Sequence, residues 1–377
     1  MSLGTRIYAE LRGDRTIWAI IAVLSIFSIL VVYSSTGTLA YREMSGNTEA
    51  LLMKHFMIVA GGLFLTYLAH LLHYMRYSKI APYLLMLSVP LLIYTIAFGA
   101  DINDARRWIT VPFVSITFQT SDFAKLALIL FVARAISSKQ DYIKDFNSAF
   151  LPIIVPVLGI CGLIAPADLS SAILLFFTCV SMMFVGRVAL QYIGLLLLLG
   201  IVVFAMLVLL GEFFPEVIRS ETWVSRVRDF VDQPDGGYQV QQAKIAMANG
   251  EWLGLGPGNS IQRNYLPSPY SDFIYAIIVE EYGIFTGMLI ILLYVLLFFR
   301  ATRLVTKSPK AFGAMLAIGL SISMVLQAFI NIAVSVHLVP VTGVTLPMIS
   351  MGGTSILFTC LSFGMILSVS KYIESVS

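Results

Sequence analysis

The sequence predicts an all-α integral membrane protein, a single polytopic domain over residues 1–377 with ten transmembrane helices. Of its residues, 58% are hydrophobic and only 12% are charged, whereas soluble domains are about one quarter charged. The hydrophobic residues form long continuous runs, not the alternating strands of a membrane β-barrel. Because the lipid core offers backbone groups no hydrogen-bonding partners, these runs must be helices.

Crossing a bilayer takes about 20 apolar residues. The ten candidate runs cover residues 17–35, 53–72, 80–99, 122–137, 150–165, 169–186, 188–210, 272–299, 311–334 and 352–370. A charged segment precedes the first run, which is long enough to remain as a span, so we expect no cleaved signal peptide. Residues 211–271 are expected to form one large loop between the seventh and eighth spans.

The loops predict the orientation of the chain. Those on the side of the N-terminus carry more Lys and Arg than the opposite loops, which places the N-terminus in the cytoplasm. Ten spans return the C-terminus to the same side, and the large loop then lies outside the cell. A net charge of +3 gives no reason to expect a nucleic acid partner. The three cysteines and four histidines show no metal-ligand spacing.

The most informative residue is Asp272, which opens the eighth apolar run after a loop with two prolines. A carboxylate at the mouth of a span usually faces a polar cavity or a partner. Partial desolvation would raise its pKa and suit it to act as a general base. The alternatives are a cation site and a cap of the helix N-terminus. Glu280 and Glu281 lie about 12 Å further along the same helix, so we expect them to form hydrogen bonds between helices instead.

Cationic residues occur on the same predicted outer side. Lys125 follows Asp122 by three residues, so it either pairs with Asp122 on the helix face or meets an anionic ligand in the outer cavity. Ser121 is expected to cap this helix. Arg106 and Arg107 either anchor the chain at the membrane interface or hold a phosphate group.

Two further segments lack the character of a span. Residues 249–260 contain Gly256 and Gly258 among four glycines, which permit turns and close backbone approach but do not form a nucleotide loop. Residues 338–355 are uncharged and rich in Pro, Gly, Ser and Thr. Broken backbone at membrane depth must be buried in protein or line a cavity, so this segment is expected to form a wall of the outer pocket.

Seven segments together resemble the SEDS family (shape, elongation, division and sporulation). They are residues 105–109, 119–126, 166–172, 238–239, 254–260, 265–276 and 340–355, and they occur in the family order. The chain departs from the family pattern at Thr120, where a proline is common, and at Met351, where a tyrosine is common. The Thr345-Leu-Pro sequence is more similar to the division branch of the family than to its elongation branch.

The resemblance implies a peptidoglycan glycosyltransferase that polymerises lipid II at the outer leaflet and releases polyprenyl diphosphate. It implies that Asp272 is the essential catalytic residue. It also implies a bacterial cytoplasmic membrane location at the division septum. The expected partners are a class B penicillin-binding protein, which is the crosslinking transpeptidase, and other division membrane proteins.

Further site residues are expected on the same basis. The candidates for binding diphosphate or sugar are Arg106, Arg107, Ser121, Lys125, Gln239, Ser350, Thr354 and Ser355. Structural or secondary roles are expected for Asp168, Gly256, Gly258, Glu280 and Glu281. Mg²⁺ or Mn²⁺ held near Asp272 is a possible cofactor, and no organic cofactor is expected.

Two other functions remain open from the sequence. A lipid II flippase would place polar groups through the whole membrane depth, whereas here the unusual polar residues gather on one side. A scaffold without activity would use the outer segment 213–230, which mixes apolar and charged residues as a docking helix does. The discriminating observation is whether the protein makes glycan.

Overall fold

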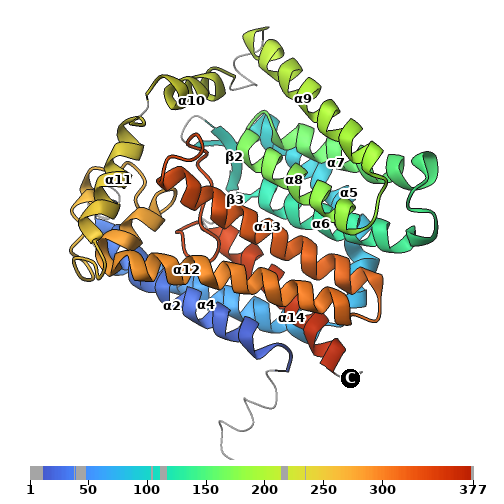
Figure 1. Cartoon of the computed structure of the whole chain (residues 1–377), viewed down its shortest axis with the longest axis horizontal. Coiled ribbons are helices and arrows are strands. Elements are labelled where there is room, and N and C mark those ends of the chain that lie inside the picture. The colour runs from blue at the N-terminus through green and yellow to red at the C-terminus, as the bar shows by residue number, and fades with distance from the viewer. Residues whose placement is uncertain are drawn as a thin grey trace, which may run out of the picture.

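The computed structural model describes residues 12–37, 39, 48–102, 105–110, 117–213, 220–233 and 235–374. It is a bundle of long helices with a small sheet and two outer helices at one end (Figure 1). The long helices are α2 (Arg15–Ser35), α4 (Thr48–Leu71), α5 (Tyr74–Phe98), α6 (Thr120–Ser138), α7 (Leu151–Ile164), α8 (Leu169–Val185), α9 (Leu190–Phe213), α12 (Ile274–Lys307), α13 (Ala311–Ser335) and α14 (Thr354–Glu374). The remaining elements are β1 (Ala100–Ile102), β2 (Ala105–Thr110), β3 (Thr117–Gln119), η1 (Gln140–Tyr142), η2 (Phe146–Phe150), α10 (Ser220–Asp232), α11 (Tyr238–Gly250) and η3 (Gln262–Asn264).

A helix occupies each of the ten apolar ranges that the sequence predicts, with ends that differ by a few residues. By length and composition, seven helices in the described part of the chain could cross a membrane. The others are α6, which carries three charged residues (Asp122, Lys125 and Arg134), and the shorter apolar segments Leu169–Val185 and Leu190–Val203. The chain is therefore a multi-pass helical membrane protein.

The all-α prediction is wrong in one respect, because residues 100–119 contain a three-stranded antiparallel sheet in the order β1-β2-β3. Trp108 pairs with Gln119 and Ile109 pairs with Phe118. Aromatic and β-branched residues favour strands, and this segment lies between two spans where it can pair with itself. The predicted large loop also contains helices: α9 extends to Phe213, and α10 and α11 lie within the remainder.

The centre of the bundle is formed by α13 and α14, the most buried of the candidate spans. In Figure 1, α13 lies between α12 and the group formed by α6 and α8, all of which it contacts. The other central helix, α14, packs closely on α4. The close approach requires Gly364 of α14, because an added Cβ there would lie 2.5 Å from the Thr66 carbonyl oxygen of α4. The Thr66 hydroxyl in turn donates to the Cys360 carbonyl at 2.8 Å.

The loop of residues 336–353, between α13 and α14, is non-helical although much of it is buried. Buried carbonyls need hydrogen-bond donors, and side chains of the surrounding helices supply them. Gln327 Nε2 donates to Thr345 O at 3.0 Å, and the hydroxyl of Tyr294 donates to Pro347 O at 2.5 Å. We call this segment the wall loop.

Candidate active site

Asp272 lies in the turn just before α12, which begins at Ile274. The residue at the N-cap position is Phe273, and no side chain caps this helix end. The capping alternative for Asp272 therefore has no support in the geometry. The one hydrogen bond that the described residues give its carboxylate comes from the Ser271 hydroxyl, which donates to Oδ1 at 2.9 Å.

The wall loop fixes the backbone around Asp272. Asn331 of α13 donates from Nδ2 to the Asp272 carbonyl at 2.9 Å and to the Val344 carbonyl at 2.7 Å. Gly343 has a φ of +71°, and an added Cβ there would lie 3.7 Å from Asp272 Oδ2. The carboxylate thus lies beside Gly343, where an added side chain would touch it.

Ser350, a predicted substrate-binding residue, has another task. Its hydroxyl donates to the Ser271 carbonyl at 2.7 Å and accepts from the Leu346 amide at 2.8 Å. Ser350 is buried, with 2% of its surface exposed. It therefore connects the wall loop to the segment that carries Asp272, and a direct substrate contact remains a prediction.

Burial raises the pKa of the Asp272 carboxyl above its ordinary value. The Ser271 hydroxyl and the positive charges of Arg226 and Arg107 oppose this rise, while the negative charge of Asp168 adds to it. The carboxyl therefore has two guanidinium groups and one acid within electrostatic range. A carboxyl with a raised pKa is better suited to take a proton near neutral pH than an ordinary aspartate.

Arg107 is anchored where α7 ends and α8 begins. Its Nε donates to the Ala167 carbonyl at 2.8 Å, and its Nη1 lies 3.4 Å from Asp168 Oδ2. Asp168 also caps α8, because its Oδ1 accepts from the Ser171 amide at 3.1 Å. Asp168 thus has a structural role. It also orients the Arg107 guanidinium, whose positive charge lowers the pKa of the Asp272 carboxyl. The side chain of Arg106 lies outside the described residues.

The start of α6 differs from its prediction. The helix begins at Thr120, so Ser121 lies within the first turn and does not cap it. Ser121 Oγ instead accepts from Gln119 Nε2 at 3.0 Å. The backbone amide of Gln119, the last residue of β3, donates to Thr354 Oγ1 at 3.2 Å. Thr354 therefore connects the sheet to α14.

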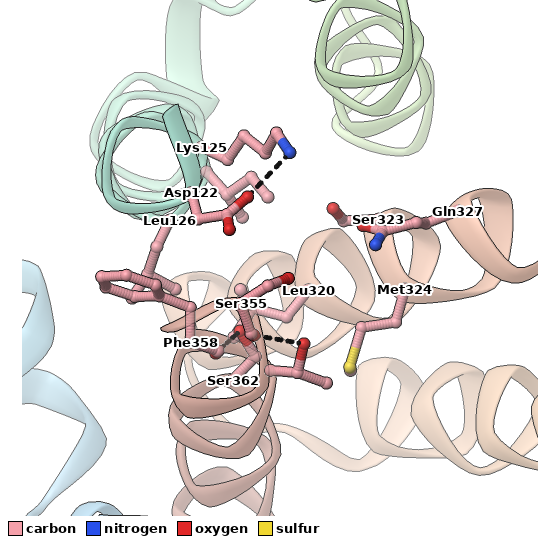
Figure 2. A pocket seen from close by; sticks show the side chains of 12 residues that line it. Asp122, Lys125, Leu126, Leu320, Ser323, Met324, Gln327, Ser355, Phe358 and Ser362 are labelled. Carbon is pink, nitrogen blue, oxygen red and sulfur yellow. Dashed lines mark hydrogen bonds and ion pairs between the residues drawn. The ribbon is translucent and has the colours of Figure 1, made fainter. Parts of the chain in front are cut away.

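Lys125 lies in a separate cavity within the bundle. Its Nζ is 2.9 Å from Asp122 Oδ1, so the predicted pairing on the helix face is present. Figure 2 shows this pair from α6 facing Gln327 and Ser323 of α13, with Ser355 of α14 nearby. Of the two Asp122 oxygens, Oδ2 is buried without a hydrogen-bond partner in the described part of the chain.

The two glutamates of α12 hold the glycine-rich segment. Glu280 Oε1 accepts from the amides of Ile261 and Gln262 at 3.1 and 3.2 Å. Glu281 accepts from the hydroxyl of Ser34 on α2. Both glutamates are buried. The predicted hydrogen bond between helices is present for Glu281, whereas Glu280 instead accepts from residues 260–262, which lie outside the long helices. Gly256 and Gly258 have φ angles of +95° and +81°, in the region that favours glycine.

Gln239 is placed on α11 and lines a cavity that also contacts the wall loop. No group of three or more His, Cys, Asp or Glu side chains in the described residues could hold a metal ion. A dedicated protein cage for Mg²⁺ or Mn²⁺ therefore does not fit this part of the chain.

Three residues of the site were not predicted from the sequence. They are Arg226, Asn331 and Gly343. A signal existed for Asn331, which is a polar residue inside an apolar span and therefore needs a partner. Arg226 becomes part of the site only through contacts between segments far apart in the chain, and Gly343 was predicted only as a member of the wall segment 338–355.

A family model described as "Cell cycle protein", which covers FtsW, RodA and SpoVE, matches residues 14–375. The "Probable peptidoglycan glycosyltransferase FtsW" of Halomonas elongata is 32% identical over 361 residues, which cover 93% of this chain and 89% of the relative. The "Stage V sporulation protein E" of Bacillus subtilis is 31% identical over 364 residues, 95% of this chain and 97% of the relative.

Solved structures share the fold. A chain from a structure titled "Structural coordination of polymerization and crosslinking by a peptidoglycan synthase complex" superposes with a TM-score of 0.72 and 24% identity, covering 96% of this chain and 98% of that chain. The rod shape determining protein RodA of Thermus thermophilus superposes with a TM-score of 0.66 and 23% identity, covering 95% and 96%.

Proposed function

The chain belongs to the FtsW, RodA and SpoVE family of cell cycle proteins, and from this membership we propose that it is a peptidoglycan glycosyltransferase that polymerises lipid II in cell division. The resemblance to the SEDS family, and to its division branch, is confirmed. The observation that carries the proposal is the position of Asp272. Asp272 is half-buried beside Gly343 of the wall loop, does not cap α12 and has cations in its field.

Asp272 is the general base in this proposal. The 4-hydroxyl of an incoming lipid II attacks the anomeric carbon of the growing strand, and Asp272 accepts the hydroxyl proton. The new bond joins the hydroxyl oxygen to the anomeric carbon, while the bond from that carbon to the diphosphate oxygen breaks. Polyprenyl diphosphate leaves with the bonding electrons.

The leaving diphosphate gains negative charge, which preorganised cations stabilise. Arg107 is the best supported of the predicted cations, because Asp168 and the Ala167 carbonyl orient its guanidinium and its charge reaches Asp272. Arg226, which donates to the Thr342 carbonyl of the wall loop, adds a second guanidinium. Lys125 and Ser355 belong to the neighbouring cavity and act, in this proposal, on substrate groups that extend into the bundle.

Mg²⁺ or Mn²⁺ remains a proposal. Because the described residues offer no cage, Asp272 would be a single protein ligand and the substrate diphosphate would supply the other oxygens, which is an ordinary arrangement for Mg²⁺. When bound, such an ion neutralises charge on the diphosphate. Loss of activity on chelation, restored by added Mg²⁺ or Mn²⁺, would support it.

The arrangement in the membrane is also proposed. All ten helices that match the predicted runs cross the bilayer, with both termini in the cytoplasm and the sheet, α10, α11 and the wall loop outside. The shorter α8 crosses as well in this arrangement, packed on α6, α7 and α13. Lipid II then reaches the site from the outer leaflet at the division septum.

A class B penicillin-binding protein is the proposed partner, together with other division membrane proteins. The supporting surface is α10, whose Val224, Val227 and Val231 are exposed by 41%, 51% and 69%. These residues are three or four apart and so lie on one face of the helix. An exposed apolar face on an otherwise charged helix fits a docking surface.

The deciding experiment is lipid II polymerisation by the purified chain with its class B partner, comparing wild type with Asp272→Asn. Asparagine keeps the shape of the side chain but cannot act as the base. Glycan ladders from wild type and none from a folded Asp272→Asn variant would establish the proposal. No ladders from a verified wild-type complex, with Mg²⁺ or Mn²⁺ present, would contradict it and favour lipid transport or a scaffold.

A further inference from the structure

A second cavity lies on the outer side of the wall loop, between α10, α11 and the loop (α10 and α11 in Figure 1). Its volume is about 380 Å³, within the range of small-ligand sites. The side chains that line it include Arg226, Asp229, Phe230, Tyr238, Gln239 and His337. Gln239 is a predicted diphosphate- or sugar-binding residue, and Arg226 is one of the proposed cations, but no ligand has yet been assigned to the cavity that they line.

The cavity adjoins the Asp272 site through shared residues. Arg226 lines the cavity, donates to the Thr342 carbonyl at 3.3 Å and has its charge within range of Asp272. Thr342 is followed directly by Gly343, which packs on the Asp272 carboxylate. Pro267, in the loop that leads to Asp272, also lines the cavity. A ligand here therefore lies one loop away from the reacting atoms.

The lining chemistry selects the ligand class. The formal charges of Arg226 and Asp229 cancel, so the cavity lacks the excess positive charge that a diphosphate needs. The rings of Phe230 and Tyr238 offer apolar faces, and the Gln239 amide can both donate and accept hydrogen bonds. Aromatic faces with a few neutral polar groups suit an uncharged polar ring with an amide substituent.

We propose that this cavity is a subsite for an uncharged N-acetylated sugar unit beside Asp272. The proposal rests on the proposed polymerase function for its biological role. Two sources share this chemistry: the growing glycan strand and the incoming lipid-linked monomer. The ring stacks against Phe230 or Tyr238, Gln239 bonds its acetamido group, and the sugar is held while Asp272 acts on its neighbour.

The test compares Gln239→Leu with Gln242→Leu. Gln242 lies on the same helix, outside the cavity, so the control makes the same chemical change. Polymerisation of lipid II by the chain with its class B partner is measured as chain length, first-coupling rate and KM. If the growing strand occupies the subsite, Gln239→Leu shortens the chains about fivefold while first coupling stays within twofold. If the monomer occupies it, the KM for lipid II rises about fivefold instead.

A direct binding measurement separates the subsite from the activity. Saturation-transfer NMR with a peptide-free N-acetylglucosamine tetrasaccharide uses the whole chain without turnover. We expect transfer with wild type and Gln242→Leu, and its loss in a folded Gln239→Leu variant. Equal transfer in both variants, or none with wild type, would overturn the subsite. Binding that Gln239→Leu removes, in a wild-type complex that makes no glycan, would leave the subsite standing and overturn the polymerase.

Discussion

Asn331 joins the carbonyl of Asp272 to the wall loop. Its Nδ2 donates to the Asp272 carbonyl at 2.9 Å and to the Val344 carbonyl at 2.7 Å, and only 1% of the residue is exposed. One buried amide thus sets the distance between the proposed base and the loop that faces it. We infer that Asn331 is a positioning residue for Asp272.

Asn331→Leu is expected to lower kcat by between about tenfold and a hundredfold with little change in KM, because a small displacement of a catalytic group slows the chemical step. Gln327→Leu is the matched control. Gln327 lies one helical turn away and holds Thr345 of the same loop, but does not contact Asp272. Each variant is expected to lose about 1–3 kcal/mol of stability. An equal loss of kcat in both variants would make Asn331 merely structural.

The sequence predicts helices well wherever apolar runs are long, since lipid leaves the backbone no other choice. It does not predict the break in α12 at Gly283, which has a φ of +79°. That break depends on a distant segment: the amides of Leu255 and Gly256 donate to the carbonyls of Glu280 and Glu281, each at 2.9 Å. The sheet is missed for a similar reason, because its strands are short and only pairing stabilises them.

The site is predicted in part. Asp272 stands out because a carboxylate at the mouth of a span is unusual, and Arg107 because cations are expected there. The role of Asn331 requires contacts to residues 59 and 13 positions away, which no local pattern reveals. Ser350 was predicted for the right region, but its hydroxyl is engaged by the backbone.

The pH dependence of stability should report the raised pKa of Asp272. Burial raises this pKa, so the folded state binds the proton more tightly than the unfolded state. Its stabilising contribution is complete below the unfolded value of 3.8 and is lost as pH rises through the folded pKa. Asp272→Asn should therefore be more stable than wild type at pH 7, with a difference that shrinks in acid. Thermal unfolding of the variant and the wild type, at pH 7 and at acidic pH, measures this difference in stability.

The raised pKa of Asp272 should also control how kcat/KM falls at acidic pH, the acidic limb of the pH profile. The base must be ionised, so kcat/KM should rise with pH through the raised pKa of Asp272. Arg226→Gln removes a charge that lowers this pKa, so it should move the limb to higher pH. A limb that stays in place would show that another group controls it.

Two variants can separate the contribution of the Asp122–Lys125 ion pair to stability from any contribution of Lys125 to activity. Lys125→Met leaves a carboxylate with a 9% exposed side chain without its partner, which should cost about 3–5 kcal/mol. Asp122→Leu combined with Lys125→Met should recover most of that stability, because a neutral pair replaces an unpaired charge. Denaturant unfolding measures both variants. If Lys125 also meets substrate, the double variant stays inactive although it is stable; recovered activity would reduce Lys125 to a structural partner.

Gly254 and Gly258 offer a matched test of how the glycine-rich segment holds the broken helix. Both have nearly the same positive φ, +83° and +81°, so alanine suffers similar backbone strain of about 1–2 kcal/mol at either position. An added Cβ at Gly254 would lie 2.3 Å from the Glu281 carbonyl oxygen, whereas at Gly258 nothing lies within 4 Å.

Gly254→Ala should therefore lose at least about 2 kcal/mol more than Gly258→Ala, because the segment must move away from the backbone that it pairs with. Denaturant unfolding of the two variants gives this difference directly. Backbone strain alone predicts equal losses, and that result would mean that the segment 250–262 can leave α12 without consequence for the fold. The larger loss at Gly254 instead makes the glycine a requirement of the break at Gly283, whose own added Cβ would lie 2.2 Å from the Trp252 carbonyl oxygen.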